Sequence, residues 1–260
     1  MHGAIAGEII GSAFANRSVK TTDFELLGTE SAMTDDSVLT VATAYAILSG
    51  GDYGSAYRKW GKIYANASYE PGFLRWLFLA NSGPYATNEN ATARRVSPIG
   101  WAFNSIDEVL KEAKKSASIT HAHADAVKGA QAVATAIFMA RTGSDTKTIK
   151  KELEGRFRYD LSTPLDKIRP SYSADVTSKG SVPQALRAFL ESANWESSIR
   201  NAISLGGHSK SQSAISGSVA EATFDGVPEN IWTECRNRIP EPMRNVCTKF
   251  SELHSIPQAA

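Results

Sequence analysis

Cysteine is nearly absent from this chain, because Cys235 and Cys247 are the only two among 260 residues. Two thiols cannot build the multi-disulfide framework of a small secreted domain, nor a zinc site held by cysteines alone. This usage fits a reducing compartment. A single disulfide between Cys235 and Cys247 stays open at this point.

Long apolar runs are also absent, and none approaches the roughly 20 residues that a membrane-spanning helix needs. Residues 1–14 are apolar, but this run is short, contains Glu8 and lacks the basic segment that begins a secretory signal peptide. We therefore expect a cytoplasmic protein with no membrane partner.

Neither sign of charge dominates, because 28 Lys and Arg residues against 27 Asp and Glu residues leave a formal net charge of +1. A polyanion-binding surface would add a basic excess, so the sequence gives no direct indication of nucleic-acid binding. With 42% hydrophobic and 21% charged residues, the composition is that of an ordinary globular protein. A chain of this length can bury a full core, and we expect residues 1–260 to form a single domain.

Strict alternation of apolar and polar residues, which marks a half-buried strand, is missing as well, whereas helical periodicity is frequent. Between Val38 and Leu48 the apolar residues recur at helical spacing, after a polar start and before a Gly-Gly stop. The segment from Asp125 to Arg141 repeats this pattern. Further helices are expected over residues 105–118, 148–157, 183–192, 195–204, 211–222, 228–238 and 242–254. The sequence therefore predicts an all-α fold, a compact bundle of many helices.

Residues 81–100 (NSGPYATNENATARRVSPIG) are predicted as the longest irregular segment. A loop of this length inside a compact domain is often functional, and a surface excursion without function is the alternative. Of the aromatic residues, we expect Trp60, Trp76 and Trp101 in the core. Candidates to stack on a ligand ring are Phe73, Tyr85 and Tyr172.

Four polar clusters stand at the edges of apolar helices: Thr34 to Asp36, Asn88 to Arg95, His121 with His123, and Gly206 to Ser211. Each has a purely structural explanation, because the first is a good helix N-cap, histidines before a helix are often structural, and the last can be a turn. Two adjacent carboxylates beside a Thr hydroxyl also provide the oxygen ligands that a hard divalent cation prefers. Taken one at a time, the clusters do not decide between structure and function.

Taken together, the motifs resemble those of the ADP-ribosylglycohydrolase family, which includes the dinitrogenase-reductase-activating glycohydrolases. The segments that carry the resemblance follow one another in the family's order: GAIAGEIIGSAF, TDDSVLTVATAYAIL, RRVSPIGWAF, THAHADAVKGAQAVATAIFMAR, SVPQALRAFLES and NAISLGGHSKSQSAISGSVAEA. The resemblance implies an all-α fold that binds two Mg ions in a cleft and cleaves the bond at the anomeric carbon of ribose. It implies ADP-ribose, or an ADP-ribosylated protein or small molecule, as the partner.

By this resemblance, Thr34, Asp35 and Asp36 match the family's first metal-ligand motif without change. His121 and His123 match the TH-x-HP motif that lines the ADP-ribose pocket, although Ala124 stands in place of the Pro.

Asn90 and Thr92 match the Asn and Ser of the family's Gly-Asn-Gly-Ser loop, which approaches the ribose and the phosphates. Glu89 and Ala91 replace both glycines of that loop. A carboxylate and a lost glycine are unfavourable where backbone must contact phosphate, and both changes disfavour the ligand's usual pose.

The family's last motif, Gly-Gly-Asp-x-Asp-Thr, completes the metal site, and the matching residues here are Gly206, Gly207, His208, Lys210 and Ser211. Ala15 stands at a further position that is acidic in the family. An ammonium about 4 Å from a divalent cation would repel it by roughly 8 kcal/mol at an effective dielectric of 20. Mg in the family geometry is therefore disfavoured, and no cofactor is expected.

Lys210 offers a cation of its own in place of the metal, and we expect its ammonium to pair with Asp35 or Asp36. Asp35, Asp36, His208 and Lys210 are the candidate catalytic residues. Three functions stay open: recognition of ADP-ribose by a pseudoenzyme, an atypical metal-independent glycohydrolase or lyase that uses His208 or His121 as acid or base, and a structural or partner-binding protein that keeps only the fold. We favour the first, and leave open whether the protein is an enzyme.

Overall fold

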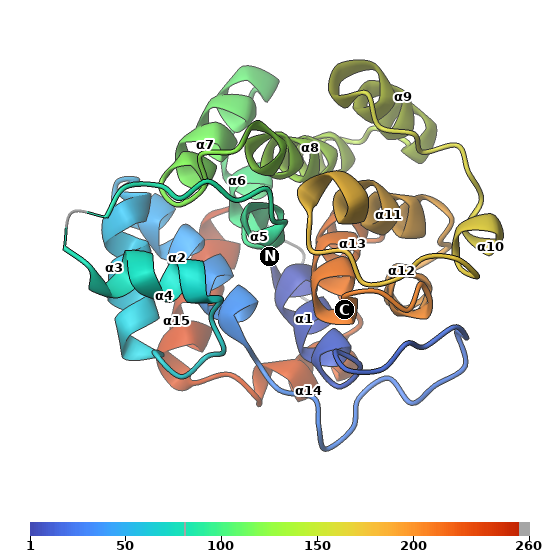
Figure 1. Cartoon of the computed structure of the whole chain (residues 1–260), viewed down its shortest axis with the longest axis horizontal. Helices are drawn as coiled ribbons and strands as arrows, with labels where there is room; N and C mark the ends of the chain where they lie inside the picture. The colour runs from blue at the N-terminus through green and yellow to red at the C-terminus, as the bar shows by residue number, and fades with distance from the viewer. Residues whose placement is uncertain (81, 255–260) are drawn as a thin grey trace.

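Helix α1 (His2–Ser12) and helix α13 (Ser209–Thr223) lie side by side at the centre of the molecule, although they come from opposite ends of the chain (Figure 1). The structure is a computed structural model and describes residues 1–80 and 82–254. A Cβ on Gly7 would overlap the carbonyl oxygen of Ser213, so only glycine permits this approach. The Ser213 hydroxyl donates to the carbonyl oxygen of Gly7 at 2.6 Å, which joins the two backbones directly.

The described residues contain fifteen helices, and isolated bridges such as Tyr85 with His121 are the extent of their β-structure. Besides α1 and α13, the helices are α2 (Asp35–Leu48), α3 (Tyr53–Ile63), α4 (Pro71–Phe78), α5 (Ala91–Arg94), α6 (Ser97–Ala102), α7 (Ile106–Ser118), α8 (Ala124–Arg141), α9 (Thr146–Phe157), α10 (Leu165–Ile168), α11 (Ser178–Leu190), α12 (Trp195–Ser204), α14 (Glu229–Arg236) and α15 (Glu241–Leu253). The predicted all-α fold is confirmed.

The other long helices surround the central pair. Helices α8, α11 and α12 pack against α13, whereas α2 and α14 pack against α1, and α3 and α15 cover α2 (Figure 1). The main hydrophobic core extends in sequence from Met1 to Phe250. Because α1 and α13 are buried on nearly all sides, their polar residues face other elements rather than bulk water.

The periodic segments form helices close to their predicted bounds, with α12 matching residue for residue. The predicted start of α11 is wrong. The helix begins at Ser178, five residues before the predicted start, and contains Pro183 in its interior. The Thr177 hydroxyl accepts a hydrogen bond from the backbone N–H of Gly180 and so caps the helix ahead of the proline.

The segment 81–100 is not irregular throughout, because it contains α5 and the first four residues of α6. These helices have four and six residues, which is too short to display a helical period in the sequence. Helices α1, α3 and α4 were also not predicted. In α1 this is because almost every residue is buried, which leaves no polar face to reveal the period.

Trp60, Trp76 and Trp101 are buried in the core, as predicted. The prediction for Phe73 is wrong, because Phe73 is 4% exposed on α4 and packs on Tyr69. Both cysteines are free and buried, so the structure contains no disulfide between them. Among residues 1–80 and 82–254, none of the helices combines the length and the apolar character that a membrane span requires.

Candidate functional site

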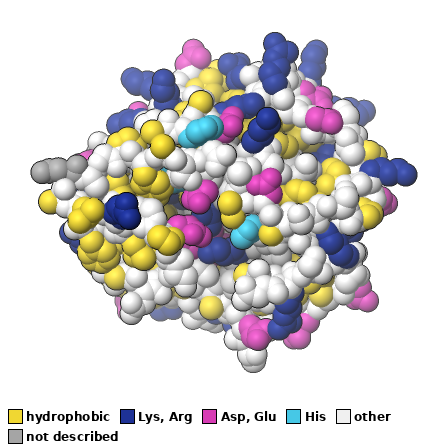
Figure 2. Space-filling view, in the orientation of Figure 1, with side chains coloured by type: hydrophobic (Ala, Val, Ile, Leu, Met, Phe, Trp, Pro, Cys, Tyr) yellow, Lys and Arg dark blue, Asp and Glu magenta, His cyan; other side chains and the backbone are white. Residues whose placement is uncertain are grey.

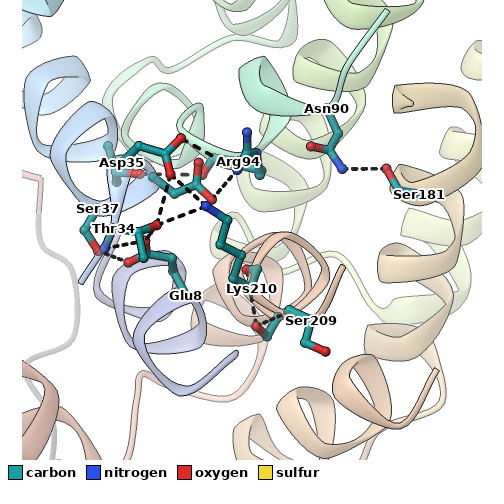
Figure 3. Close-up of polar contacts among 12 residues, drawn as sticks. Glu8, Thr34, Asp35, Ser37, Asn90, Arg94, Ser181, Ser209 and Lys210 are labelled. Carbon is teal, nitrogen blue, oxygen red and sulfur yellow. Dashed lines mark hydrogen bonds and ion pairs between the residues drawn. The ribbon is translucent and has the colours of Figure 1, made fainter. Parts of the chain in front are cut away.

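The first turns of α2 and α13 bring Thr34 and Asp35 into contact with Lys210 (Figure 3). The Lys210 ammonium lies 2.8 Å from Oδ1 of Asp35 and 3.3 Å from Oγ1 of Thr34. The predicted pairing of Lys210 with one of the two aspartates is therefore confirmed. Asp35 is 5% exposed and Lys210 is 17% exposed at the side chain, so the pair is largely removed from solvent.

A second buried ion pair joins Asp36 to Arg94 of α5. The guanidinium Nη1 lies 2.6 Å from Oδ2 of Asp36 and 3.9 Å from Oδ2 of Asp35. Sequence analysis does not single out Arg94, although it lies within the polar segment Asn88 to Arg95. The signal that could have identified it is chemical: two adjacent buried carboxylates need a counter-charge each, and Lys210 supplies only one.

Glu8 of α1 is a third buried acidic residue beside Asp35 and Asp36. Its Oε1 accepts from the backbone N–H of Thr34 at 2.8 Å, and its carboxyl group also bonds the hydroxyls of Thr34 and Ser37. Burial, followed by the charge of Asp36, raises the pKa of Glu8 to about 8. Glu8 is therefore mostly protonated at pH 7. The sequence signal that could have identified Glu8 is its position as the one acidic residue of the apolar segment 1–14.

We call Glu8, Asp35, Asp36, Arg94 and Lys210 the Asp35–Asp36 cluster. Burial opposes the charge of Lys210 and of Arg94, but Asp36 and Asp35 outweigh it and raise the pKa of both groups. Burial also raises the pKa of Asp36, and Arg94 counteracts this by stabilising the carboxylate. The two ion pairs set one carboxyl group against one cation each, Asp35 with Lys210 and Asp36 with Arg94.

These residues do not fit the two Mg ions that the family resemblance implies. Each aspartate accepts a short hydrogen bond from a side-chain cation, and the Thr34 hydroxyl is bonded by Glu8, so the three predicted metal positions already have partners. A divalent ion would have to displace both cations or lie beside them against their repulsion. Within residues 1–80 and 82–254, no group of three His, Cys, Asp or Glu side chains is arranged to hold a metal ion.

His208 is the N-cap residue of α13, and its side chain makes no capping hydrogen bond. Burial, followed by the charges of Arg94 and Lys210, lowers its pKa below the usual value, so the imidazole is neutral at pH 7.

The two glycines before His208 contact the protein's own chain. Gly206 has a φ of +71°, and a Cβ there would lie 2.7 Å from both Cε of Lys20 and Oγ of Ser18. Gly207 lies against the ring of Tyr172 and the side chain of Gln212. Both positions need glycine, one for its backbone conformation and the other for close packing.

The predicted ligand-binding residues of the 88–95 segment use their side chains within the protein. Nδ2 of Asn90 donates to the hydroxyl of Ser181 at 2.8 Å (Figure 3), and the Thr92 hydroxyl donates to the carbonyl oxygen of Ala126 at 2.7 Å. Both residues are buried. They therefore fix α5, and with it Arg94, against α11 and α8.

The two predicted histidines of the THAHAD segment have different surroundings. His121 is fully buried, its Nδ1 contacts the Thr120 hydroxyl at 2.8 Å, and its ring packs on Tyr85. Burial, followed by Arg95, lowers the pKa of His121 to about 3, so it is neutral. His123 is the N-cap of α8 and accepts from the backbone N–H of Asp125, which is a structural role.

The remaining two predicted positions lie at helix ends. Ser211 is buried in the first turn of α13, and Ala15 is exposed in the turn after α1.

A groove adjoins the Gly206–Gly207 turn at Tyr172. Its volume is about 600 Å³, and its lining includes Tyr172, Asp175 and Gln184. Figure 2 shows acidic, basic and histidine side chains gathered near the centre of the same face. The volume lies within the range of small-molecule sites, which are typically 300–1,000 Å³.

The fold and the cluster define an all-helical protein whose central carboxylates are paired with side-chain cations. Residues 1–257 match the family model of the ADP-ribosylglycohydrolases, and the chain belongs to that family. An uncharacterized protein of Archaeoglobus fulgidus is 30% identical over an alignment of 197 residues, which covers 70% of this chain and 63% of that protein. The chain thus matches less than two thirds of this relative's length.

A solved structure of an ADP-ribosylglycohydrolase-related protein complex is similar over 99% of both chains, with a TM-score of 0.67 and 19% sequence identity. At this level of identity the likeness shows the shared fold.

Proposed function

We propose that this protein recognises ADP-ribose, or an ADP-ribosylated partner, at the Asp35–Asp36 cluster, without the two-Mg hydrolysis of its family. The observation that carries the proposal is the double ion pair, Lys210 with Asp35 and Arg94 with Asp36. These cations supply the positive charge that the two aspartates would otherwise take from metal ions.

A charge-balanced cluster suits the hydroxyl-rich part of such a ligand. Carboxylate oxygens accept hydrogen bonds from ribose hydroxyls, and ammonium and guanidinium groups donate to them, so recognition needs no bound metal. The groove beside Tyr172 has room for the remainder of a nucleotide-sized ligand. The side chains thus support binding without metal, whereas they do not support the two-Mg hydrolysis of the family.

Isothermal titration calorimetry tests the proposal. ADP-ribose is titrated into the protein in EDTA and again in MgCl2, with ADP and ribose 5-phosphate as comparison ligands. We expect micromolar binding of ADP-ribose with the same Kd in both buffers. Binding that requires Mg would contradict the charge argument and indicate an active glycohydrolase. No heat from any ligand would favour a structural or partner-binding protein.

A metal-independent glycohydrolase is the second candidate, and the neutral, half-buried His208 near Lys210 favours it. Here the protein is incubated in EDTA with ADP-ribosylated arginine and serine peptides, and released ADP-ribose is measured. Turnover that disappears in His208→Ala would establish this activity. With no turnover, the recognition function stands without catalysis.

A further inference from the structure

The side chain of Lys20 ends in a cradle of three backbone carbonyl oxygens. Its ammonium donates to Arg169 at 2.7 Å, to Tyr172 at 2.6 Å and to Leu205 at 2.6 Å. An ammonium has three N–H donors, so all of them are used. The acceptors come from two separate segments, the turn that follows α10 and the end of α12.

This cradle lies directly against the turn that leads to the Asp35–Asp36 cluster. Cε of Lys20 occupies the space where a Cβ of Gly206 would be, and the Ser18 hydroxyl donates to the carbonyl oxygen of Gly206 at 3.3 Å. Four residues after Gly206 the chain reaches Lys210, the partner of Asp35. The position of Lys20 therefore influences where α13 begins.

Lys20 is an exposed residue, and no carboxylate of the described ranges forms an ion pair with it, so the three carbonyl oxygens are the protein groups that hold its charge. Converging carbonyl oxygens are also the groups that replace the hydration shell of K⁺ in selectivity filters. The neighbouring Arg169 does not fill this role, because its guanidinium bonds Asp166 and the Ser204 hydroxyl.

We propose that Lys20 is a positioning residue that acts as a tethered monovalent cation. Its ammonium binds the α10 turn to the end of α12 and thereby fixes the Gly206–Lys210 turn for the pairing of Lys210 with Asp35. Removal of the side chain converts the cradle into a binding site for K⁺. This inference concerns the geometry of the turn and does not depend on ADP-ribose as the ligand.

The test measures acylation of the Lys210 amine by mass spectrometry in the full-length protein. In the native protein the ion pair with Asp35 protects this amine. In Lys20→Ala we expect the rate to rise on the order of tenfold, because the amine of Lys210 leaves its ion pair with Asp35 more often. KCl restores slow labelling, whereas tetramethylammonium chloride at equal ionic strength does not, because that cation is too large for the cradle.

Arg200→Ala is the matched control, because Arg200 ties the same N-terminal segment to α12 through the carbonyl oxygens of Thr22 and Phe24. We expect no selective effect of K⁺ on this variant or on the unmodified protein. Unchanged labelling in Lys20→Ala, or equal recovery with both salts, would overturn the proposal. If Lys20→Ala does not fold in tetramethylammonium chloride, its refolding in KCl is measured. Folding in KCl alone supports the K⁺ site in the cradle, and failure to fold in both salts contradicts it.

Discussion

Arg94 and Lys210 each neutralise one carboxylate of a buried aspartate pair, and they reach it from different helices. Thr34, Asp35, Asp36 and Lys210 are predictable from the sequence because they lie in recognisable motifs. Arg94 and Glu8 are not, because neither residue reveals from the sequence which side chain it will face. Which side chains Glu8 and Arg94 contact depends on how α1 and α5 are packed in the fold.

If the two cations exclude Mg, replacing them should admit it. We predict that the double variant Lys210→Asp, Arg94→Leu binds Mg. Its Tm should rise on the order of 5 °C when MgCl2 is present at about 100 times the Kd of the variant for Mg. Differential scanning fluorimetry with and without EDTA measures this. The matched control, Lys210→Leu with Arg94→Leu, removes the cations without adding a ligand. An equal Mg-dependent increase in the unmodified protein would refute the prediction.

Glu8 makes stability depend on pH. Its folded-state pKa is raised from 4.5 to about 8, so the protonated form is favoured by folding. The stabilisation is complete below pH 4.5 and is lost as the pH rises through about 8. Between pH 5 and pH 8, the free energy of unfolding should fall by about 2–4 kcal/mol relative to Glu8→Gln.

Urea denaturation at a series of pH values checks the Glu8 prediction. The exposed Glu25→Gln variant is the control and should follow the unmodified protein. Parallel pH profiles of the unmodified protein and Glu8→Gln would show that Glu8 is ionised in the folded state.

At the scale of elements, length decided what the sequence could predict. Helices α2, α8 and α12 contain several turns, and a polar start precedes the recurring apolar residues of each, so they are visible in the sequence. The fully buried α1 and the four-residue α5 and α10 lack such a period. Their conformations follow from tertiary packing, which a single sequence does not display.

The contact between α1 and α13 should tolerate no added carbon at Gly7. We predict that Gly7→Ala lowers the free energy of unfolding by about 3 kcal/mol or more, because the new methyl group would overlap the Ser213 backbone. Gly155→Ala in α9 is the control, since a Cβ there meets nothing within 4 Å. That variant should be about 0.5–1 kcal/mol more stable. Equal destabilisation of both, measured by urea denaturation, would contradict the packing argument.

At the scale of the whole molecule, the two thiols report on global opening. Cys235 and Cys247 are 0% and 2% exposed, and burial raises the pKa of each thiol to about 12. We predict that neither reacts appreciably with a thiol reagent at pH 8 in the native protein, and that both react together as urea unfolds the chain. Rapid native labelling of one thiol would show that α14 or α15 opens separately.

The central position of α1 also has a consequence for the order of events during synthesis. Gly7 and its partner Ser213 are 206 positions apart in the chain. At about 5–20 residues per second, the ribosome needs roughly 10–40 s to deliver α13 after α1. Throughout that interval the apolar helix α1 has α2 available but lacks α13, the helix that packs most closely against it. The nascent chain should therefore depend on a chaperone that shields its first helix until the last third has emerged.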